Sequence, residues 1–278
     1  LGLRQTAADA LKLLLKEDII PKAADKAVFV IAPFVVFLPA MMVYIVIPFD
    51  HNLVPQNLSL GLLFIVAIAA VPTIGIIMAG WGSNNKYSML GAIRAAAQTV
   101  SYEVPLILVL TTVVLWTGEL TTKGIVEAQK NVWLAGPLFV GFILFIICGL
   151  AEINRTPFDI PEAESELVGG FHTEYSGMRF AFFFMGEYAH LLFVSALTTT
   201  LFLGGWYFLP WVPELGGVPG WVWFLVKTYA MVLLFMWIRW TYPRLRVDQL
   251  MKFSWKGLVP LSLVYLLVMG FIKVWQNG

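Results

Sequence analysis

Long apolar stretches alternate with short polar connectors along almost the whole chain. A bilayer core takes about 20 mostly apolar residues per transmembrane helix. Seven stretches reach or approach that length, and four of them carry no ionised side chain. The seven stretches are residues 27–48, 60–80, 100–117, 132–151, 180–203, 220–240 and 257–272. The pattern therefore predicts an all-α, polytopic transmembrane helical bundle with seven spans.

The spans are too long and too uniformly apolar to be strands of a membrane barrel, in which polar and apolar residues alternate. Proline removes a backbone donor wherever it occurs in a helix. Neighbouring helices usually compensate for such a loss in membranes, so we expect local kinks and not breaks. The prolines concerned are Pro33, Pro39, Pro72, Pro105 and Pro137.

A shorter amphipathic segment precedes the first span. Between Leu3 and Ile19, apolar residues recur at a spacing of three and four, and basic and acidic residues occupy the other positions. The segment is too charged to cross a bilayer, so we predict a helix that lies in the interfacial plane. Two interpretations stay open: a surface strut, or a lintel over an opening through which a molecule enters from the lipid.

The composition limits the class of protein. Of the 278 residues, 59 % are hydrophobic and only 13 % are charged, and the net charge is +1. An average soluble domain is about 25 % charged. These values exclude a soluble globular enzyme, a disordered protein and a nucleic-acid binder.

The basic residues predict the orientation, because cytoplasmic loops carry an excess of lysine and arginine. Fourteen of the eighteen fall on one side of the predicted membrane, which we take as cytoplasmic. They are Arg4, Lys12, Lys16, Lys22, Lys26, Lys86, Arg94, Arg155, Arg179, Arg239, Arg244, Arg246, Lys252 and Lys256.

Four regions follow from these patterns. Residues 1–26 form the interfacial helix and a connector, and residues 27–151 form transmembrane helices with a cytoplasmic loop at 81–99. Residues 152–179 form an acidic cytoplasmic loop, and residues 180–278 form transmembrane helices with a basic cytoplasmic loop at 241–256. The basic run at 239–256 suits either anionic lipid headgroups or an acidic partner, and the sequence does not choose between them.

The acidic loop is the strongest chemical feature. Six carboxylates and one arginine lie within the 23 residues from Glu152 to Glu174, against the usual excess of positive charge. Apolar residues such as Phe158 and Phe171 alternate with them, which favours a partly buried acidic funnel over a freely solvated loop. Crowded carboxylates raise one another's pKa and titrate as a coupled set.

Ionisable residues also fall inside the spans. Glu187 lies seven residues into its span, where a charge costs about 2.5–3.5 kcal/mol on insertion scales, so it is a functional candidate. Glu103, near the start of another span, is a weaker candidate. Lys227 is similarly deep from the opposite face, and an ion pair or a shared water chain with a carboxylate is open to it.

The chain has few ligands for a redox centre. Its only cysteine is Cys148, and its only histidines are His51, His172 and His190. Iron–sulfur clusters need about four cysteine ligands. We therefore expect no redox centre in the chain, and any electrons come from a partner.

Four stretches resemble a known family, the quinone-site membrane subunit (H-type subunit) of respiratory complex I, the proton-pumping NADH:quinone oxidoreductase. The longest is AEINRTPFDIPEAESELVGGFHTEYSGMRFAFFFMGEY at residues 151–188. The others lie at residues 4–18, 81–103 and 242–256, so the resemblance covers essentially the whole chain in order. The family has eight spans, one of them before the interfacial helix, so the resemblance implies a first span that is missing here.

The resemblance implies that quinone enters beside the interfacial helix and moves toward an iron–sulfur cluster held by a partner. Asp9 would lie near this opening, Arg155 and Asp159 would line the quinone chamber, and Phe184 would line its apolar part. The proton path from the chamber into the membrane would consist of Glu103, Glu152, Glu162, Glu164, Glu166, Glu174 and Glu187. No catalytic residue and no metal ligand is implied in this chain.

The implied function is that of an enzyme subunit that forms much of the quinone chamber and couples quinone reduction to proton translocation through buried carboxylates. Quinone is the substrate, and NADH, FMN and iron–sulfur clusters belong to partner subunits. The implied partners are peripheral-arm subunits with the terminal iron–sulfur cluster, small membrane subunits, antiporter-like pumping subunits and membrane lipids, but no nucleic acid.

We expect a multi-pass protein of the bacterial inner membrane, with the mitochondrial inner membrane as second choice. Two alternative functions remain open: a related subunit of a membrane-bound hydrogenase, and a stand-alone ion transporter. A transporter would be expected to show repeats and discontinuous helices around a midplane site.

Overall fold

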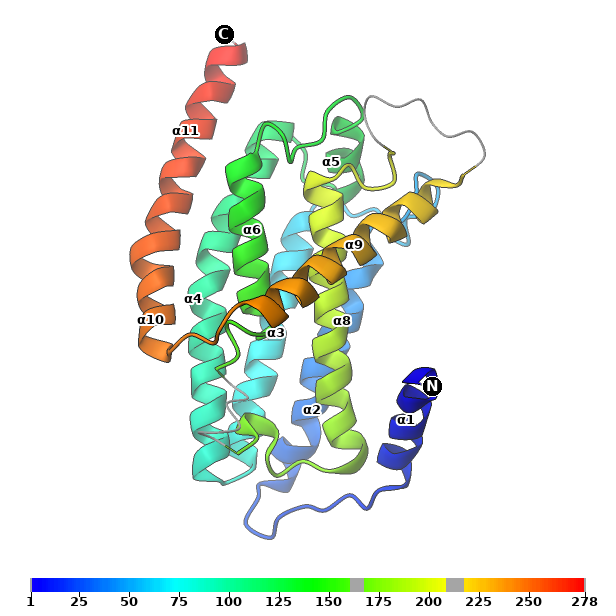
Figure 1. Ribbon diagram of the computed structural model, residues 1–278, viewed down its shortest axis with the longest axis vertical. Coiled ribbons are helices and arrows are strands. Elements are labelled where there is room, and N and C mark those ends of the chain that lie inside the picture. The colour runs from blue at the N-terminus through cyan, green and yellow to red at the C-terminus, as the bar shows by residue number, and fades with distance from the viewer. Residues whose placement is uncertain (1, 161–167, 209–217, 278) are drawn as a thin grey trace. The chain divides into compact units, whose positions relative to one another are not determined.

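The computed structural model describes residues 2–160, 168–208 and 218–277, and every regular element in these ranges is helical (Figure 1). The elements are η1 (Gly2–Arg4), α1 (Gln5–Leu15), α2 (Lys26–Met42), η2 (Val43–Val46), α3 (Gly61–Gly82), α4 (Lys86–Thr117), α5 (Thr122–Ala128), α6 (Phe139–Glu152), η3 (Gly170–His172), α8 (Gly177–Phe202), α9 (Gly220–Thr241), α10 (Val247–Phe253), the π-helical turn η4 (Ser254–Leu258) and α11 (Val259–Asn277).

In the part of the chain that the structure describes, six helical segments are long and apolar enough to cross a membrane, which confirms the predicted all-α polytopic bundle. They correspond to six of the seven stretches predicted from hydropathy. Their bounds are Lys26–Val46, Gly61–Gly82, Lys86–Thr117, Gly177–Phe202, Gly220–Thr241 and Val247–Gln276.

The remaining predicted span, residues 132–151, is helical only from Phe139 onward. The 14 residues of α6 make a helix about 21 Å long, which is shorter than a bilayer core. Turns precede it: Gly136 N donates to Trp133 O (3.1 Å), and Pro137 follows with no amide hydrogen to donate.

Two expected loops contain helix. Residues 86–99, expected in the cytoplasmic loop 81–99, form the first half of the 32-residue helix α4. Asn85 accepts a hydrogen bond from Tyr87 N (2.9 Å), as a residue at a helix N-terminus does, and the alanine-rich run that follows favours helix. Likewise α10 lies within the expected basic loop 241–256.

Four of the five prolines named above lie inside helices that continue past them. Pro33 and Pro39 are in α2, Pro72 is in α3 and Pro105 is in α4. For these four prolines the expectation that the spans are not broken is confirmed, whereas for Pro137 it is wrong, because the helix of that span begins only at Phe139.

The chain divides into two compact units. The first comprises the described residues of Leu1–Met42, Ile68–Ala97 and Asp159–His190, and the second those of Val43–Ala67, Gln98–Phe158 and Leu191–Gly278. In the first unit, Phe29 of α2 stacks on Tyr175 with ring centroids 4.0 Å apart. The Tyr175 hydroxyl donates to Phe29 O (3.2 Å), so this pair fixes the segment before α8 to α2.

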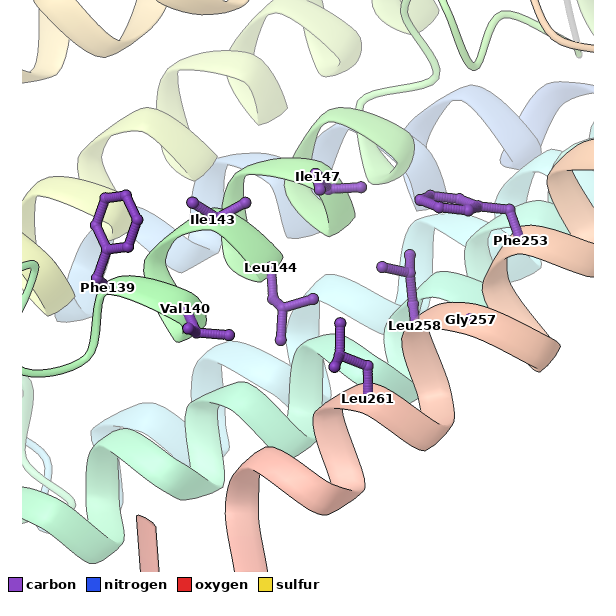
Figure 2. A pocket seen from close by; sticks show the side chains of 9 residues that line it. All are labelled: Phe139, Val140, Ile143, Leu144, Ile147, Phe253, Gly257, Leu258 and Leu261. Carbon is purple, nitrogen blue, oxygen red and sulfur yellow. The ribbon is translucent and has the colours of Figure 1, made fainter. Parts of the chain in front are cut away.

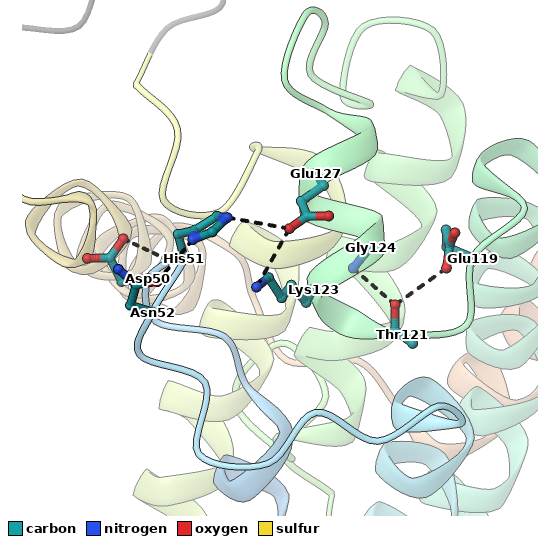
Figure 3. Close-up of polar contacts among 8 residues, drawn as sticks. All are labelled: Asp50, His51, Asn52, Glu119, Thr121, Lys123, Gly124 and Glu127. Atoms are coloured by element: carbon teal, nitrogen blue, oxygen red, sulfur yellow. Dashed lines mark hydrogen bonds and ion pairs between the residues drawn. The ribbon is translucent and has the colours of Figure 1, made fainter.

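The second unit carries polar contacts around the short helix α5 (Figure 3). Thr121 begins the helix by accepting a hydrogen bond from Gly124 N (3.1 Å). Near the other end of α5, Glu127 lies 3.9 Å from His51 Nε2 and 3.8 Å from Lys123 Nζ. All three side chains are at least a quarter exposed, so these ion pairs contribute little to stability.

In the first unit, helix α4 and the turn η3 approach each other at a glycine pair. A Cβ atom added at Gly91 would lie 2.8 Å from Gly170 Cα and 2.9 Å from Phe171 N. Neither neighbour is the flexible end of a side chain, so the contact cannot be relieved without moving the backbone. Gly91 therefore sets how closely η3 packs on α4.

We predict that Gly91→Ala destabilises the protein by about 1–3 kcal/mol, because the extra methyl group overpacks this contact. The measurement is the melting temperature of the detergent-solubilised protein. Gly270→Ala is the control: its added Cβ would meet only Leu115 Cδ1, at 3.8 Å, and alanine favours helix. Equal melting temperatures for Gly91→Ala and the unchanged protein would contradict the prediction.

Candidate functional site

Helix α1 presents an apolar face that the rest of the chain leaves exposed. Leu11 and Leu14 are each 60 % exposed and Leu15 is 85 % exposed. Asp9, predicted to lie where quinone enters, is on this helix and about half exposed. Its carboxylate lies 3.5 Å from Lys12 Nζ and 3.4 Å from Gln5 Nε2. The exposed leucines are those expected of a helix that lies in a membrane interface.

The segment that follows α1 is held to the start of α8. Ile19 N donates to Ser176 Oγ (3.0 Å), and Asp18 forms an ion pair with Arg179 (3.2 Å). Asn84, in the connector between α3 and α4, donates to Ala23 O (3.1 Å). Asp9 is therefore tied through a short segment to the helix that carries Phe184 and Glu187.

An aromatic cluster surrounds His172 at the end of η3. The centroid of the imidazole ring lies 5.1 Å from the ring centroid of Phe171, 5.3 Å from that of Phe180 and 5.9 Å from that of Phe184. All three pairs are nearly edge-to-face. Burial lowers the pKa of His172 from 6.5 to about 4. The imidazole is therefore neutral near pH 7, with one ring nitrogen able to donate a hydrogen bond and the other able to accept one.

Hydrogen bonds from α4 and its N-terminal residue position the acidic loop beside this cluster. Asn85 Nδ2 donates to Glu174 (2.6 Å), and Ser88 Oγ donates to Phe171 O (2.9 Å). Thr173 Oγ1 closes the turn by donating to Gly170 O (2.7 Å). Burial also raises the pKa of Tyr175, so its hydroxyl stays protonated and keeps its bond to α2.

In the second unit, the side chain of Gln98 forms hydrogen bonds around the N-terminal end of the acidic loop. Its amide nitrogen lies 2.8 Å from Ala151 O, 2.9 Å from Asn154 Oδ1 and 2.7 Å from Phe158 O. Three acceptors around one atom identify it as the donor, and the side chain is only 1 % exposed. The predicted chamber residue Arg155 lies in this same segment and is 8 % exposed.

Two of the predicted proton-path carboxylates belong to the second unit and influence each other electrostatically. Glu103 of α4 and Glu152 at the end of α6 are near enough for their charges to interact. Glu174 and Glu187 belong to the first unit, and Glu187 is half-buried within α8. Glu162, Glu164 and Glu166 lie outside the described residues.

The remaining predicted chamber residues divide between the units. Asp159 is partly buried and belongs to the first unit, and Arg155 belongs to the second. Phe184 is placed with the aromatic cluster: its ring centroid lies 4.6 Å from that of Phe180. Asp9, Asp159, Phe184, Glu174 and Glu187 therefore share the first unit.

Lys227 binds backbone carbonyls. Its ammonium donates to Leu203 O (2.6 Å), Gly205 O (3.1 Å) and Tyr207 O, and lies 4.6 Å from the centre of the Trp133 ring. This differs from the carboxylate pairing considered from the sequence. The lysine satisfies acceptors at and after the C-terminus of α8, where a positive charge is favourable.

Sequence reasoning gave no role to His172 and none to Gln98. A weak signal existed for Gln98, the one amide in the run AAAQTV on a helix that packs inside the protein. For His172, the only indication in the sequence is the presence of aromatic residues at 171, 180 and 184, which the turn between η3 and α8 brings together. Among the residues that the structure describes, no three His, Cys, Asp or Glu side chains gather as a metal site would require.

Comparison with known proteins identifies the family. The family model described as NADH dehydrogenase matches residues 1–270. A protein of Brevibacillus brevis, named as the H subunit of NADH-quinone oxidoreductase, is 53 % identical over 278 residues, which is all of this chain and 82 % of the relative. Proteins of the same name from Anoxybacillus flavithermus and Geobacillus kaustophilus are 53 % and 52 % identical over 98 % and 99 % of this chain, and each match covers 81 % of the relative. The chain belongs to the NADH dehydrogenase family, that of the H-type membrane subunit of NADH-quinone oxidoreductase, the enzyme also called respiratory complex I.

Proposed function

We propose that this membrane subunit of NADH-quinone oxidoreductase forms part of the quinone-binding chamber and couples quinone reduction to proton translocation. The relatives' name supports a quinone oxidoreductase over the hydrogenase subunit and the stand-alone transporter. Electrons come from NADH through FMN and iron–sulfur clusters in the peripheral-arm subunits, and the pumping subunits are the antiporter-like ones. The location is the bacterial inner membrane.

The observation that carries the quinone proposal is the aromatic cluster around His172. A quinone headgroup is a flat ring with two carbonyl oxygens, so it binds well against an aromatic surface that also offers a hydrogen-bond donor. Phe180 and Phe184, whose rings pack against each other, supply that surface, and neutral His172 supplies the donor. The neutral state matters because burying a positively charged imidazolium would destabilise the folded protein before quinone binds.

The carboxylates support the coupling proposal. Reduction of the quinone to quinol adds two electrons and takes up two protons, so negative charge appears at the headgroup before the protons arrive. Carboxylates that interact with one another respond to such a charge as a coupled set. We place Glu103 and Glu152 in this set, together with Glu162, Glu164, Glu166, Glu174 and Glu187, and Arg155 and Asp159 at the chamber end.

Phe184→Ala should raise the KM for quinone about 2- to 10-fold, because one aromatic contact to the headgroup is lost. The assay is NADH:quinone reduction by the purified complex. NADH oxidation by a water-soluble acceptor, reduced in the partner subunits, should not change. Phe271→Ala is the matched control, since Phe271 is 76 % exposed on α11. An unchanged KM in Phe184→Ala would remove this residue from the chamber.

His172 should make the protein acid-sensitive in a defined range. The pKa of the imidazole is about 4 in the folded protein and near 6.5 in the unfolded chain. Between these values the unfolded chain takes up a proton that the folded protein excludes, so stability falls as the pH drops from 6.5 to 4. The melting temperature of the complex should therefore fall more steeply over this range than that of His172→Gln. Parallel curves for the two proteins would contradict the buried, neutral imidazole.

Glu187→Gln should lower both NADH:quinone activity and proton pumping about tenfold or more, because a side chain that transfers protons typically contributes about 10²-fold or more. Pumping is measured by the pH change inside proteoliposomes that contain the complex. The control is Glu127→Gln, which removes a carboxylate whose side chain is 45 % exposed and whose ion pairs are weak (Figure 3). Full activity in Glu187→Gln would exclude Glu187 from the proton path.

A further inference from the structure

An apolar cavity of about 280 Å³ lies between α6 and the segment that joins α10 to α11, within the second unit (Figure 2). Val140, Leu144 and Ile147 line it from α6, and Phe253, Gly257 and Leu261 line it from the other side. Every lining side chain is a hydrocarbon, and Gly257 has none. The cavity therefore suits an apolar ligand and offers no side-chain hydrogen bond to water.

Two features of the helices border this cavity. Near one end, the helices touch at Gly141, where an added Cβ would lie 2.8 Å from the hydroxyl oxygen of Tyr265. Toward the other end, Ser254–Leu258 form a π-helical turn between α10 and α11, and such turns occur frequently at functional sites. Gly257 lies in this turn, and a Cβ added to it would meet only a ring carbon of Phe253, at 3.7 Å. Beside Gly257, the Phe253 ring is therefore the one described group outside the helix's own backbone that an added Cβ would contact.

The outer surface around the cavity is apolar and exposed, as a surface that faces hydrocarbon would be. Leu261 and Leu263 are each 49 % exposed, and Val264 is 56 % exposed, all on α11. Helix α11 lies in a segment long and apolar enough to cross a membrane. An acyl chain of the bilayer can therefore reach the cavity sideways, without crossing a polar layer.

The end of the cavity at Phe253 and Gly257 adjoins basic residues. Lys252 and Lys256 are exposed, and each directly precedes one of these lining residues in the chain. They are four residues apart, a spacing that places side chains near one another on a helical surface. Arg244 and Arg246, both exposed, precede them in the same segment. This is the membrane side predicted to be cytoplasmic, where lysine and arginine attract anionic headgroups.

We propose that this cavity is a binding site for one anionic glycerophospholipid of the cytoplasmic leaflet. One acyl chain occupies the cavity between α6 and α11, and the phosphate lies against Lys252 and Lys256. The charge of the flanking lysines selects the headgroup, and the apolar lining selects the chain. In this proposal the basic segment binds lipid and not an acidic partner.

The test uses the purified complex and phosphatidylglycerol with a photoreactive diazirine midway along one acyl chain. After irradiation, mass spectrometry locates the labelled peptides. We expect label in residues 139–147 and 253–261, and weaker label from phosphatidylethanolamine with the same chain. At subsaturating probe, Lys252→Gln and Lys256→Gln should each reduce the phosphatidylglycerol label about fivefold, as removal of one lysine near a charged surface predicts.

Gly257→Leu should abolish the label at both segments, because the leucine side chain fills the space that the acyl chain occupies. The charge control is Lys130→Gln, an exposed lysine outside this segment, which should label as the unchanged complex does. Migration of each variant as the intact complex on a native gel shows that assembly is preserved, and the lysine variants test the site even if Gly257→Leu fails to assemble.

Two results would overturn the proposal. Equal labelling by the two lipids, unchanged in both lysine variants, would show that the lysines select no headgroup. Absence of label from both segments in the unchanged complex, with the probe attached to a partner subunit instead, would show that another protein covers the cavity.

Discussion

Backbone amides and carbonyls inside apolar spans have no water to bond with, and the rest of this structure depends on how the chain meets that constraint. Inside a helix the backbone groups bond to one another, so the groups without a partner are those at helix ends and in connectors. Gln129 is the clearest example of a side chain that bonds to such groups. Its amide nitrogen donates to Ile125 O (3.1 Å) and Thr200 O (2.8 Å), and its oxygen accepts from Leu134 N (3.3 Å) and Gly204 N (3.0 Å). One fully buried side chain thus forms hydrogen bonds to three separate backbone segments.

Gln98 and Lys227 perform the same task elsewhere in the second unit. Gln98 binds carbonyls in the last turn of α6 and after it, and Lys227 binds carbonyls that follow α8. Because each contact joins residues far apart in the chain, these polar groups also fix tertiary structure. The acidic loop after α6 is consequently held at its start by a side chain from α4, and a chamber built from that loop inherits a defined position.

The sequence predicts the long spans because an apolar run of about 20 residues matches the thickness of a bilayer core, and only 13 % of the residues are charged. It predicts helix ends less well. Residues 86–99 are polar enough to suggest a loop, yet they form a helix whose inner face packs on η3 through Gly91. The three acceptors of Gln98 lie 53 to 60 residues away from it along the chain, and periodicity carries no information on which distant segments meet. The aromatic cluster around His172 is local in sequence, but its rings come together through the turn between η3 and α8, which periodicity does not describe either. Single-residue candidates such as Glu187 are easier to predict, because a carboxylate in an apolar span can be recognised in the sequence without knowledge of its neighbours.

Under the proposed function, the choice between amide and carboxylate distinguishes structural from titrating positions. Where the chain needs only hydrogen bonds inside the protein, at 98 and 129, it uses glutamine, which is neutral at every pH and supplies both a donor and an acceptor. At 103 and 187 it uses glutamate, and an ionised carboxylate in a span costs about 2.5–3.5 kcal/mol. A protonated glutamate offers hydrogen bonds of the same kind as an amide, so the carboxyl group adds nothing structural that glutamine would lack. What it adds is the ability to gain and lose a proton, which is the property that a pathway between a quinone chamber and the membrane interior requires.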